Sequence, residues 1–274
     1  MADDAGRPAP SQVIVTADDL GMHPAWDRAC VEGIERGVLT SASLVTSGAR
    51  YREARALLRS LGDPDVGVHL DLLSTRPLSP AREVPSLLGP DGAFPGSWRA
   101  VAARYVRGDL SPREVRLEWG RQVARLRDDG VTPTHLNSHY HLHMLPGLFD
   151  VAQEVADAHG IPHVRVVDEA PWSSRGAAAQ VPTSALLWLL AVRARARLAG
   201  RRPVHCRGVA AGADLGLPEW DAILSRLPAE ATEVVCHPGQ SPYQDDALRS
   251  PTLRAWLRAR ARVTSFGSLA GPAA

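Results

Sequence analysis

The chain has 274 residues, of which 45% are hydrophobic and 22% charged, and its formal net charge at pH 7 is +1. This composition excludes an intrinsically disordered chain and is typical of a globular domain with a large apolar core. The small net charge and the lack of a long basic block argue against nucleic acid as a partner.

The N-terminal residues are polar and lack the apolar stretch of a secretory signal peptide. The three cysteines have no C-x-x-C spacing, which argues against a disulfide framework and favours a reducing compartment. We therefore expect a cytoplasmic protein, with residues 1–11 as a flexible polar leader and residues 12–270 as a single domain.

Short apolar runs alternate along the chain with longer stretches of helical periodicity. This pattern predicts repeated strand–helix units and a parallel sheet. About eight strands is the number that a TIM-like barrel needs, so we predict an α/β fold, a TIM-like, somewhat irregular (β/α) barrel. The strands are predicted at residues 12–17, 41–46, 66–70, 133–138, 163–167, 203–207, 233–236 and 262–266. The helices are predicted at residues 26–36, 49–61, 112–129, 148–159, 184–198, 220–227 and 252–261.

Two segments stand out from this rhythm. Residues 74–95 are rich in Pro, Gly and Ser, which predicts a long loop that either covers the substrate or is a surface insertion. Residues 184–198 form the most apolar predicted helix. It is too short to cross a bilayer, so we expect a barrel helix without stable membrane insertion, with lipid contact as the alternative.

Acidic and imidazole side chains stand at the ends of four predicted strands. The segments are VIVTADD, DVGVHLD, THLNSHYHLH and TEVVCHP. Because the carboxyl ends of parallel strands lie on one face of a sheet or barrel, side chains far apart in the sequence meet there. We expect five of them to converge on one mouth: Asp18, Asp19, His69, His139 and His237.

The first segment places two carboxylates next to each other, followed by Gly21. Side chains alternate along a strand, but where the backbone turns, two neighbours can face the same pocket. Two close carboxylates repel unless a cation or a shared proton intervenes. We predict that Asp19 binds a metal ion and that Asp18 transfers protons. The alternative is that one of the pair only caps the next helix.

A carboxylate and two imidazoles, from Asp19, His69 and His139, form a ligand set that leaves coordination positions open for water and substrate. Open positions are typical of catalytic sites, whereas structural zinc sites are closed. Imidazole favours Zn²⁺ or a neighbouring transition ion, and leaves Mg²⁺ or another divalent ion as the alternative. For His69 taken alone, a buried core histidine is the simpler interpretation. His135, deeper in its strand, is expected to be structural.

Other polar residues near these strand ends are given supporting roles. His237 is predicted to be a general acid that protonates a leaving amine, with a buried histidine bonded to backbone as the alternative. His141 and His143 are expected to lie in a loop near the substrate. Arg165 is expected to pair with Asp18 and keep it ionised, or else to lie on the surface.

With these residues identified, the chain resembles the YdjC-like family of carbohydrate deacetylases, which includes chitooligosaccharide deacetylases and a branch associated with hopanoid lipid biosynthesis. The matching stretches span most of residues 13–239. They are TADDLGMHPAWDRACVEGIERGVLTSASLVTSG, VGVHLDL, PTHLNSHYHLHMLPGLFDVAQEVADAHGIPHVRV and CHPG. The resemblance implies a TIM-like, irregular barrel and a divalent metal used to remove acetyl groups from N-acetylated sugars.

The resemblance also implies functional roles at the five strand-end positions. Asp18 becomes the catalytic base, His237 a catalytic or oxyanion-stabilising histidine, and the other three the metal ligands. The chain departs from the family at Asn137, where many members have an aspartate, and at Tyr140, where many have a third consecutive histidine. The implied partner is a small carbohydrate with an N-acetyl group, and a homodimer is left open.

Two alternative functions remain open at the level of the sequence. The first is a metal-dependent hydrolase of another amide, such as a lactam or a lipid-linked amino sugar. The second is a non-catalytic barrel that binds sugar or metal. Asp18 argues against the second, because metal binding alone does not require an extra base beside the ligands.

Overall fold

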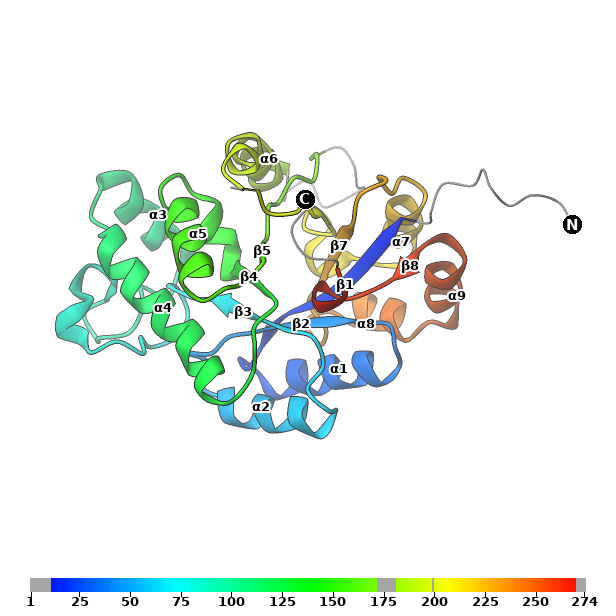
Figure 1. Cartoon of the computed structure of the whole chain (residues 1–274), viewed down its shortest axis with the longest axis horizontal. Helices are drawn as coiled ribbons and strands as arrows, with labels where there is room; N and C mark the ends of the chain where they lie inside the picture. Colours follow the sequence, from blue (N-terminus) through cyan, green and yellow to red (C-terminus); the bar gives the residue numbers. More distant parts are fainter. Residues whose placement is uncertain (1–10, 172–180, 199, 270–274) are drawn as a thin grey trace, which may run out of the picture.

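The computed structural model describes residues 11–171, 181–198 and 200–269, which form an α/β fold with a curled parallel sheet surrounded by helices (Figure 1). This arrangement confirms the predicted fold class, a TIM-like, irregular barrel in a single domain. Residues 1–10 of the predicted leader lie outside the described residues, so the boundaries of leader and domain stay a prediction.

All eight predicted strands are present, and every pairing between them is parallel. The order along the sheet is β5-β4-β3-β2-β1-β7-β6, and β8 pairs with β1 off this path. The strands are β1 (Gln12–Leu20), β2 (Ser41–Leu44), β3 (Val66–Leu70), β4 (His135–Ser138), β5 (His163–Val164), β6 (His205–Arg207), β7 (Thr232–Cys236) and β8 (Arg262–Val263).

The last strand makes the barrel irregular. In a closed eight-stranded barrel, the eighth strand lies between the seventh and the first. Here Val13 of β1 pairs with Thr232 of β7 on one side and with Val263 of β8 on the other. Along this second edge of β1, Gln12 and Val13 pair with β8, and the residues from Thr16 onward pair with β2. Within the described residues no pairing joins β5 to β6, so the sheet is a half-barrel that stays open there.

The helices form an outer layer around the strands (Figure 1). All seven predicted helices are present, with ends shifted by a few residues. Two further helices, α3 and α8, were not predicted, because each is short and directly follows a segment rich in Pro and Gly. The helices are α1 (Pro24–Glu35), α2 (Tyr51–Ser60), α3 (Trp98–Arg107), α4 (Pro112–Asp128), α5 (Leu148–Ala158), α6 (Val181–Ala196), α7 (Leu217–Leu224), α8 (Pro242–Arg249) and α9 (Pro251–Arg260).

The irregular segment after β3 is anchored by buried polar side chains. The carboxylate of Asp71 accepts hydrogen bonds from the backbone N–H groups of residues 73, 74 and 75. Glu118 of α4 accepts two more from residues 78 and 79, and Gln122 bonds to both Asp71 and Glu118. These bonds satisfy buried backbone groups and tie the segment to α4. None of residues 74–95 lines the pocket described below, which favours a surface insertion over a substrate cover.

Helix α6 packs one face on the core and exposes the other. Leu187 and Ala191 are buried, whereas Leu186, Leu189 and Val192 are 51%, 61% and 69% exposed. Across the described part of the chain, no helix combines the length and the hydropathy that crossing a membrane would require.

Candidate active site and metal centre

Asp18 and Asp19 lie in a β-bulge near the end of β1. Three steps along β1, from Ala17 to Leu20, are paired with only two along β2. Asp19 has a left-handed backbone with a φ of 65°, which an aspartate adopts more readily than most side chains. The bulge breaks the alternation of the strand, so both neighbours line one pocket, and each is only 3% exposed. The strand therefore runs past its predicted end at Ala17.

His69, near the end of β3, lies in register with Asn137 of β4. The terminal amide of Asn137 is 2.6 Å from Nδ1 of His69 and 2.7 Å from the hydroxyl of Ser43. When the amide oxygen faces Nδ1, that nitrogen carries the hydrogen and the Nε2 lone pair is free for a metal ion. In the reverse orientation, the amide nitrogen donates to Nδ1 of His69, which places the ring hydrogen on Nε2, and the amide oxygen accepts from Ser43 and Arg165. Asn137 thus controls the tautomer of His69.

His135 lies deeper in the barrel and outside the pocket. Its Nε2 is 3.0 Å from the hydroxyl of Ser43, and its ring stacks on Phe266 at 4.2 Å between centroids. Burial, reinforced by the charge of Arg165, holds the pKa of His135 well below its ordinary value. Gly67 of β3 makes room for the ring, because a Cβ there would lie 2.4 Å from it. This packing agrees with a structural role.

The short segment η3 (His139–Met144), which has a kink at Tyr140 and His141, places the imidazole of His139 beside Asp19. Tyr140 and His141 have positive φ values of 52° and 54°, so the alternating pattern stops where β4 ends. His139 Nδ1 consequently lies 2.8 Å from Oδ1 of Asp19. His141 and Tyr140 both line the same pocket, and Tyr140 is 59% exposed.

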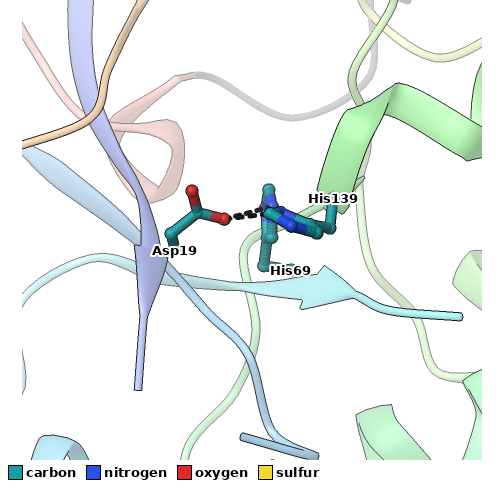
Figure 2. Close-up of side chains that lie close together, drawn as sticks. All are labelled: Asp19, His69 and His139. Atoms are coloured by element: carbon teal, nitrogen blue, oxygen red, sulfur yellow. Dashed lines mark hydrogen bonds and ion pairs between the residues drawn. The ribbon is translucent and has the colours of Figure 1, made fainter. Parts of the chain in front are cut away.

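The three predicted ligands come together at the ends of β1, β3 and β4 (Figure 2). Oδ1 of Asp19 is 3.2 Å from Nε2 of His69, and one ligand atom from each of the three residues lies within 4.8 Å of the other two. Zn²⁺ binds imidazole nitrogen and carboxylate oxygen at about 2.0–2.2 Å, so donors this close fit a single divalent cation. Burial opposes ionisation of Asp19, but hydrogen bonds from His139 and His69 outweigh it and hold the pKa well below its ordinary value.

Arg165, which directly follows β5, bridges two buried carboxylates. Its Nη1 and Nη2 donate to Asp18 at 2.5 and 2.9 Å, and its Nε and Nη2 donate to Glu233 of β7 at 3.0 and 2.7 Å. Burial disfavours the charge on Asp18, but Arg165 and then His69 outweigh it, so the pKa of Asp18 lies well below its ordinary value. Arg165 therefore pairs with Asp18, as expected, and does not lie on the surface.

His143 turns away from the pocket and supports the backbone of Arg165. Its Nε2 donates to the carbonyl oxygen of Arg165 at 2.9 Å, and its Nδ1 accepts from the hydroxyl of Ser138 at 2.7 Å. Burial lowers the pKa of His143 to about 3, so the ring is neutral. The ring contacts the polar network beneath the site, whereas His141 lines the pocket itself.

His237 directly follows β7, and a hydrogen bond from its backbone N–H to Gln244 of α8 holds it in place. Its N–H donates to Oε1 of Gln244 at 2.5 Å, and Nε2 of Gln244 donates to the carbonyl oxygen of Gly212 at 3.0 Å. Both His237 and Gly212 line the pocket. Nδ1 of His237 is buried and has no hydrogen-bond partner among the described residues, and the side chain as a whole lines the pocket.

The five strand-end residues share a pocket of about 280 Å³. Its size suits a small ligand, and its polar groups converge from β1, β3, β4 and β7.

Two residues of the polar network around this pocket, Glu233 and Gln240, were not predicted from the sequence. Glu233 is a charged residue in an otherwise apolar strand, which was a usable signal. Gln240 donates to Asp19 at 2.7 Å, and only its position after His-Pro-Gly pointed to the site.

The fold and the pocket define the class of this protein: a parallel α/β barrel whose strand ends carry a carboxylate and histidine cluster able to hold a metal ion. The chain belongs to the YdjC-like protein family, because the model of that family matches residues 12–270. This membership confirms the resemblance seen in the sequence.

Relatives of known name support the same grouping. The chain is 38% identical over 163 residues to a carbohydrate deacetylase of Mus musculus, covering 58% of this chain and 51% of the relative. A chitooligosaccharide deacetylase of Serratia marcescens is 29% identical over 268 residues, covering 90% of this chain and 94% of the relative. The chain thus spans about half the length of the mouse relative and nearly all of the bacterial one.

A solved structure shows the fold independently. A proposed cellobiose-phosphate cleavage protein from Enterococcus faecalis V583 superposes with a TM-score of 0.69 at 23% identity. The match covers 95% of this chain and 99% of that one, so the two proteins share nearly the whole fold.

Proposed function

We propose that this protein is a metal-dependent hydrolase that removes the N-acetyl group from an amino sugar and releases acetate. The observation that carries the proposal is the single pocket that Asp18, Asp19, His69, His139 and His237 line together. The deacetylases among the relatives support an N-acetylated carbohydrate as the substrate.

Asp19, His69 and His139 would hold the cation, and their two imidazoles favour Zn²⁺ over Mg²⁺. When bound, a divalent ion of this kind polarises the acetamide carbonyl and lowers the pKa of water from about 16 towards neutrality. The remaining residues of the pocket then handle protons and position the sugar.

Asp18 is the proposed base. Arg165 binds both of its oxygens and keeps the carboxylate ionised across the neutral pH range. Asp18 accepts a proton from the water whose oxygen attacks the acetyl carbonyl carbon. His237 then donates a proton to the sugar nitrogen as the C–N bond breaks. The products are acetate and a free amino sugar.

Replacing the base tests this assignment. Asp18→Asn keeps the shape but removes the proton acceptor, so we expect acetate release from N,N′-diacetylchitobiose to fall by about 10²–10⁴-fold in kcat. Asp109→Asn, at a carboxylate that is 52% exposed and pairs with Arg107, is the matched control and should keep full activity. Undiminished turnover in Asp18→Asn would remove the proposed base.

Metal dependence is tested by chelation. Treatment with a chelator should abolish acetate release, and adding back Zn²⁺, Mg²⁺ or another divalent ion to the apoprotein should identify which ion restores it. Asp19→Asn should weaken metal binding, because it replaces the anionic ligand with an amide. Full activity after chelation would contradict a metal-dependent mechanism. One metal ion bound per chain without turnover on any acetylated sugar would favour a binding protein instead.

A lipid-linked amino sugar is the second candidate substrate, and one feature of α6 favours it. Thr183, in the first turn of the helix, lines the pocket, and the exposed face of Leu186, Leu189 and Val192 continues from there. An apolar face beside the pocket could hold a lipid chain. If so, Leu189→Glu should lower kcat/KM for a lipid-linked N-acetylglucosamine and leave that for diacetylchitobiose unchanged.

A further inference from the structure

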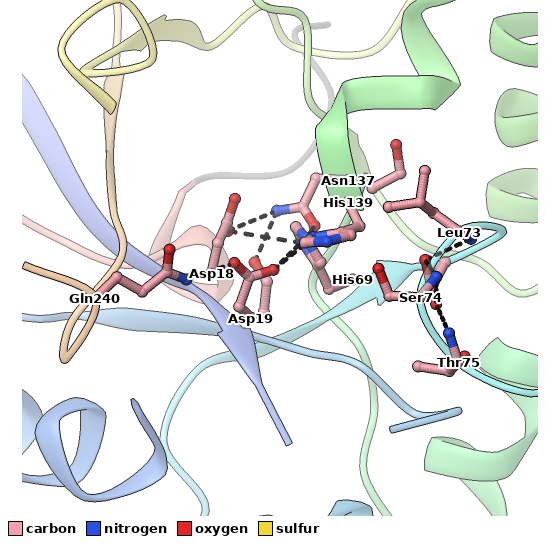
Figure 3. A network of polar contacts seen from close by, with 12 residues as sticks. Asp18, Asp19, His69, Leu73, Ser74, Thr75, Asn137, His139 and Gln240 are labelled. Atoms are coloured by element: carbon pink, nitrogen blue, oxygen red, sulfur yellow. Dashed lines mark hydrogen bonds and ion pairs between the residues drawn. The ribbon is translucent and has the colours of Figure 1, made fainter. Parts of the chain in front are cut away.

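The two oxygens of the Asp19 carboxylate have different partners. Oδ1 faces the two histidines, 3.2 Å from Nε2 of His69 and 2.8 Å from Nδ1 of His139. Oδ2 instead accepts a hydrogen bond from Nε2 of Gln240 at 2.7 Å. Gln240 approaches from the side opposite the histidines (Figure 3). Because a carboxylate only accepts, the group of Gln240 that meets it must be the N–H₂ end of the amide.

The loop that carries Gln240 is held in place by its own bonds. The backbone N–H of Gln240 donates to the carbonyl oxygen of His237 at 3.2 Å. The N–H of Gly239 donates to Asp245 of α8 at 2.7 Å. Gly239 has a φ of 82°, and a Cβ there would lie 3.0 Å from backbone atoms of Ala25 and Trp26, so the turn requires glycine. One loop thus positions His237 and the Gln240 amide together.

We propose that Gln240 is a positioning residue that restricts Asp19 to binding the metal through Oδ1 alone. This inference rests on the proposed metal site. The hydrogen bond from Gln240 occupies one lone pair of Oδ2 and holds that oxygen on the side away from the histidines, so Oδ1 is the oxygen that faces a cation bound beside the two imidazoles. Three protein donors leave more coordination positions for water and substrate than four would. Gln240 therefore helps to keep the site open for catalysis.

The test uses Co²⁺ as the probe, added to the full-length apoprotein. Gln240→Met keeps the length of the side chain but cannot donate a hydrogen bond. We expect the Kd for Co²⁺ to rise by about 10–100-fold, as is usual when a partner of a metal ligand is lost. We also expect the visible absorption per bound Co²⁺ to weaken, because a second oxygen from Asp19 raises the coordination number.

Ser241→Ala is the matched control, because this neighbour begins α8 without making a side-chain cap bond. It should bind Co²⁺ as the parent does, with the same absorption. If Gln240→Met also binds and absorbs as the parent does, the inference is wrong. If its Kd rises but the absorption is unchanged, Gln240 only stabilises the loop, and the restriction on Asp19 is wrong. A parent protein that binds no Co²⁺ would instead contradict the metal site itself.

Discussion

One buried arginine, Arg165, pairs with two buried carboxylates at the pocket, Asp18 and Glu233. Arg165 donates four hydrogen bonds to Asp18 and Glu233, and all three residues are at least 95% buried. Such a group is costly to assemble but more costly to break, since removing one partner leaves an uncompensated buried charge. The arginine is thus needed both for the ionised state of Asp18 and for the stability of the barrel.

Removing the arginine should expose this dependence. Arg165→Met leaves two buried carboxylates without a cation, so we expect it to lower the free energy of unfolding by about 3–5 kcal/mol. Adding Glu233→Gln to that variant removes one of the stranded charges and should restore part of the loss. Urea unfolding of the two variants and the parent measures both changes. A double variant less stable than Arg165→Met would contradict the charge argument.

At the scale of the elements, close approach between neighbouring strands shapes the interior below the site. β3 and β4 pair in register, and His135 of β4 projects over Gly67 of β3. The bulge in β1 is the second such feature, since it turns two adjacent carboxylates to one side. Both features add polar groups to an interior that also holds Arg165 and Glu233 within a large apolar core.

Adding a methyl group at Gly67 tests the fit of His135. The Cβ of Gly67→Ala would lie 2.4 Å from the imidazole, and we expect the strain to cost about 1–3 kcal/mol of stability. Gly120→Ala, in the interior of α4, is the matched control, because nothing lies within 4 Å of its Cβ. That change should instead stabilise the protein by roughly 0.5–1 kcal/mol. Equal stabilities for the two variants in thermal unfolding would refute the predicted clash.

At the scale of the whole molecule, folding removes several imidazoles from water. Burial, the largest cause in each case, lowers the pKa of five histidines, to about 3 for His143 and to about 4 for His163. The other three are His135 and His141, whose pKa values lie well below the ordinary value, and His159, whose pKa is also lowered. His69 is the opposite case: burial lowers its pKa, but Asp18 and Asp19 outweigh burial and raise it.

The sign of the pH dependence follows from these shifts. The five histidines with a lowered pKa contribute stability above pH about 6.5, and this is lost as pH falls towards their folded pKa values, because the unfolded chain binds more protons. His69 contributes stability below pH about 6.5 that is lost as pH rises, but it is one group against five. The apoprotein should therefore become less stable as pH falls from 7 to 5.

The contribution of one histidine, His143, to this pH dependence can be measured with a single variant. His143→Gln can still bond Ser138 and the Arg165 carbonyl but does not titrate. Between about pH 4 and 6 it should reduce the slope of the unfolding free energy against pH by about 1.4 kcal/mol per pH unit. Urea unfolding across this range measures the slope. An unchanged slope would show that His143 is already protonated in the folded protein.

Much of this protein could be predicted from local patterns. The alternation of apolar runs and helical stretches predicted all eight strands and seven of the nine helices within the described residues. Asp19, His69 and His139 could be selected because parallel strands must end on one face. The pattern could not reveal that β7 pairs directly with β1 and leaves β8 off the main path, because the spacing of strands along the chain carries no information about which strands become neighbours.

The sequence by itself determined the elements and the ligand types, because periodicity and side-chain chemistry are properties of short segments. Tertiary structure alone decided the partners of those ligands. Gln240 meets Asp19 across 221 positions of the chain, and Arg165 meets Glu233 across 68. Such pairs depend on distances that exist only after the strands are packed, where burial makes each hydrogen bond and charge pair matter more than it does in water.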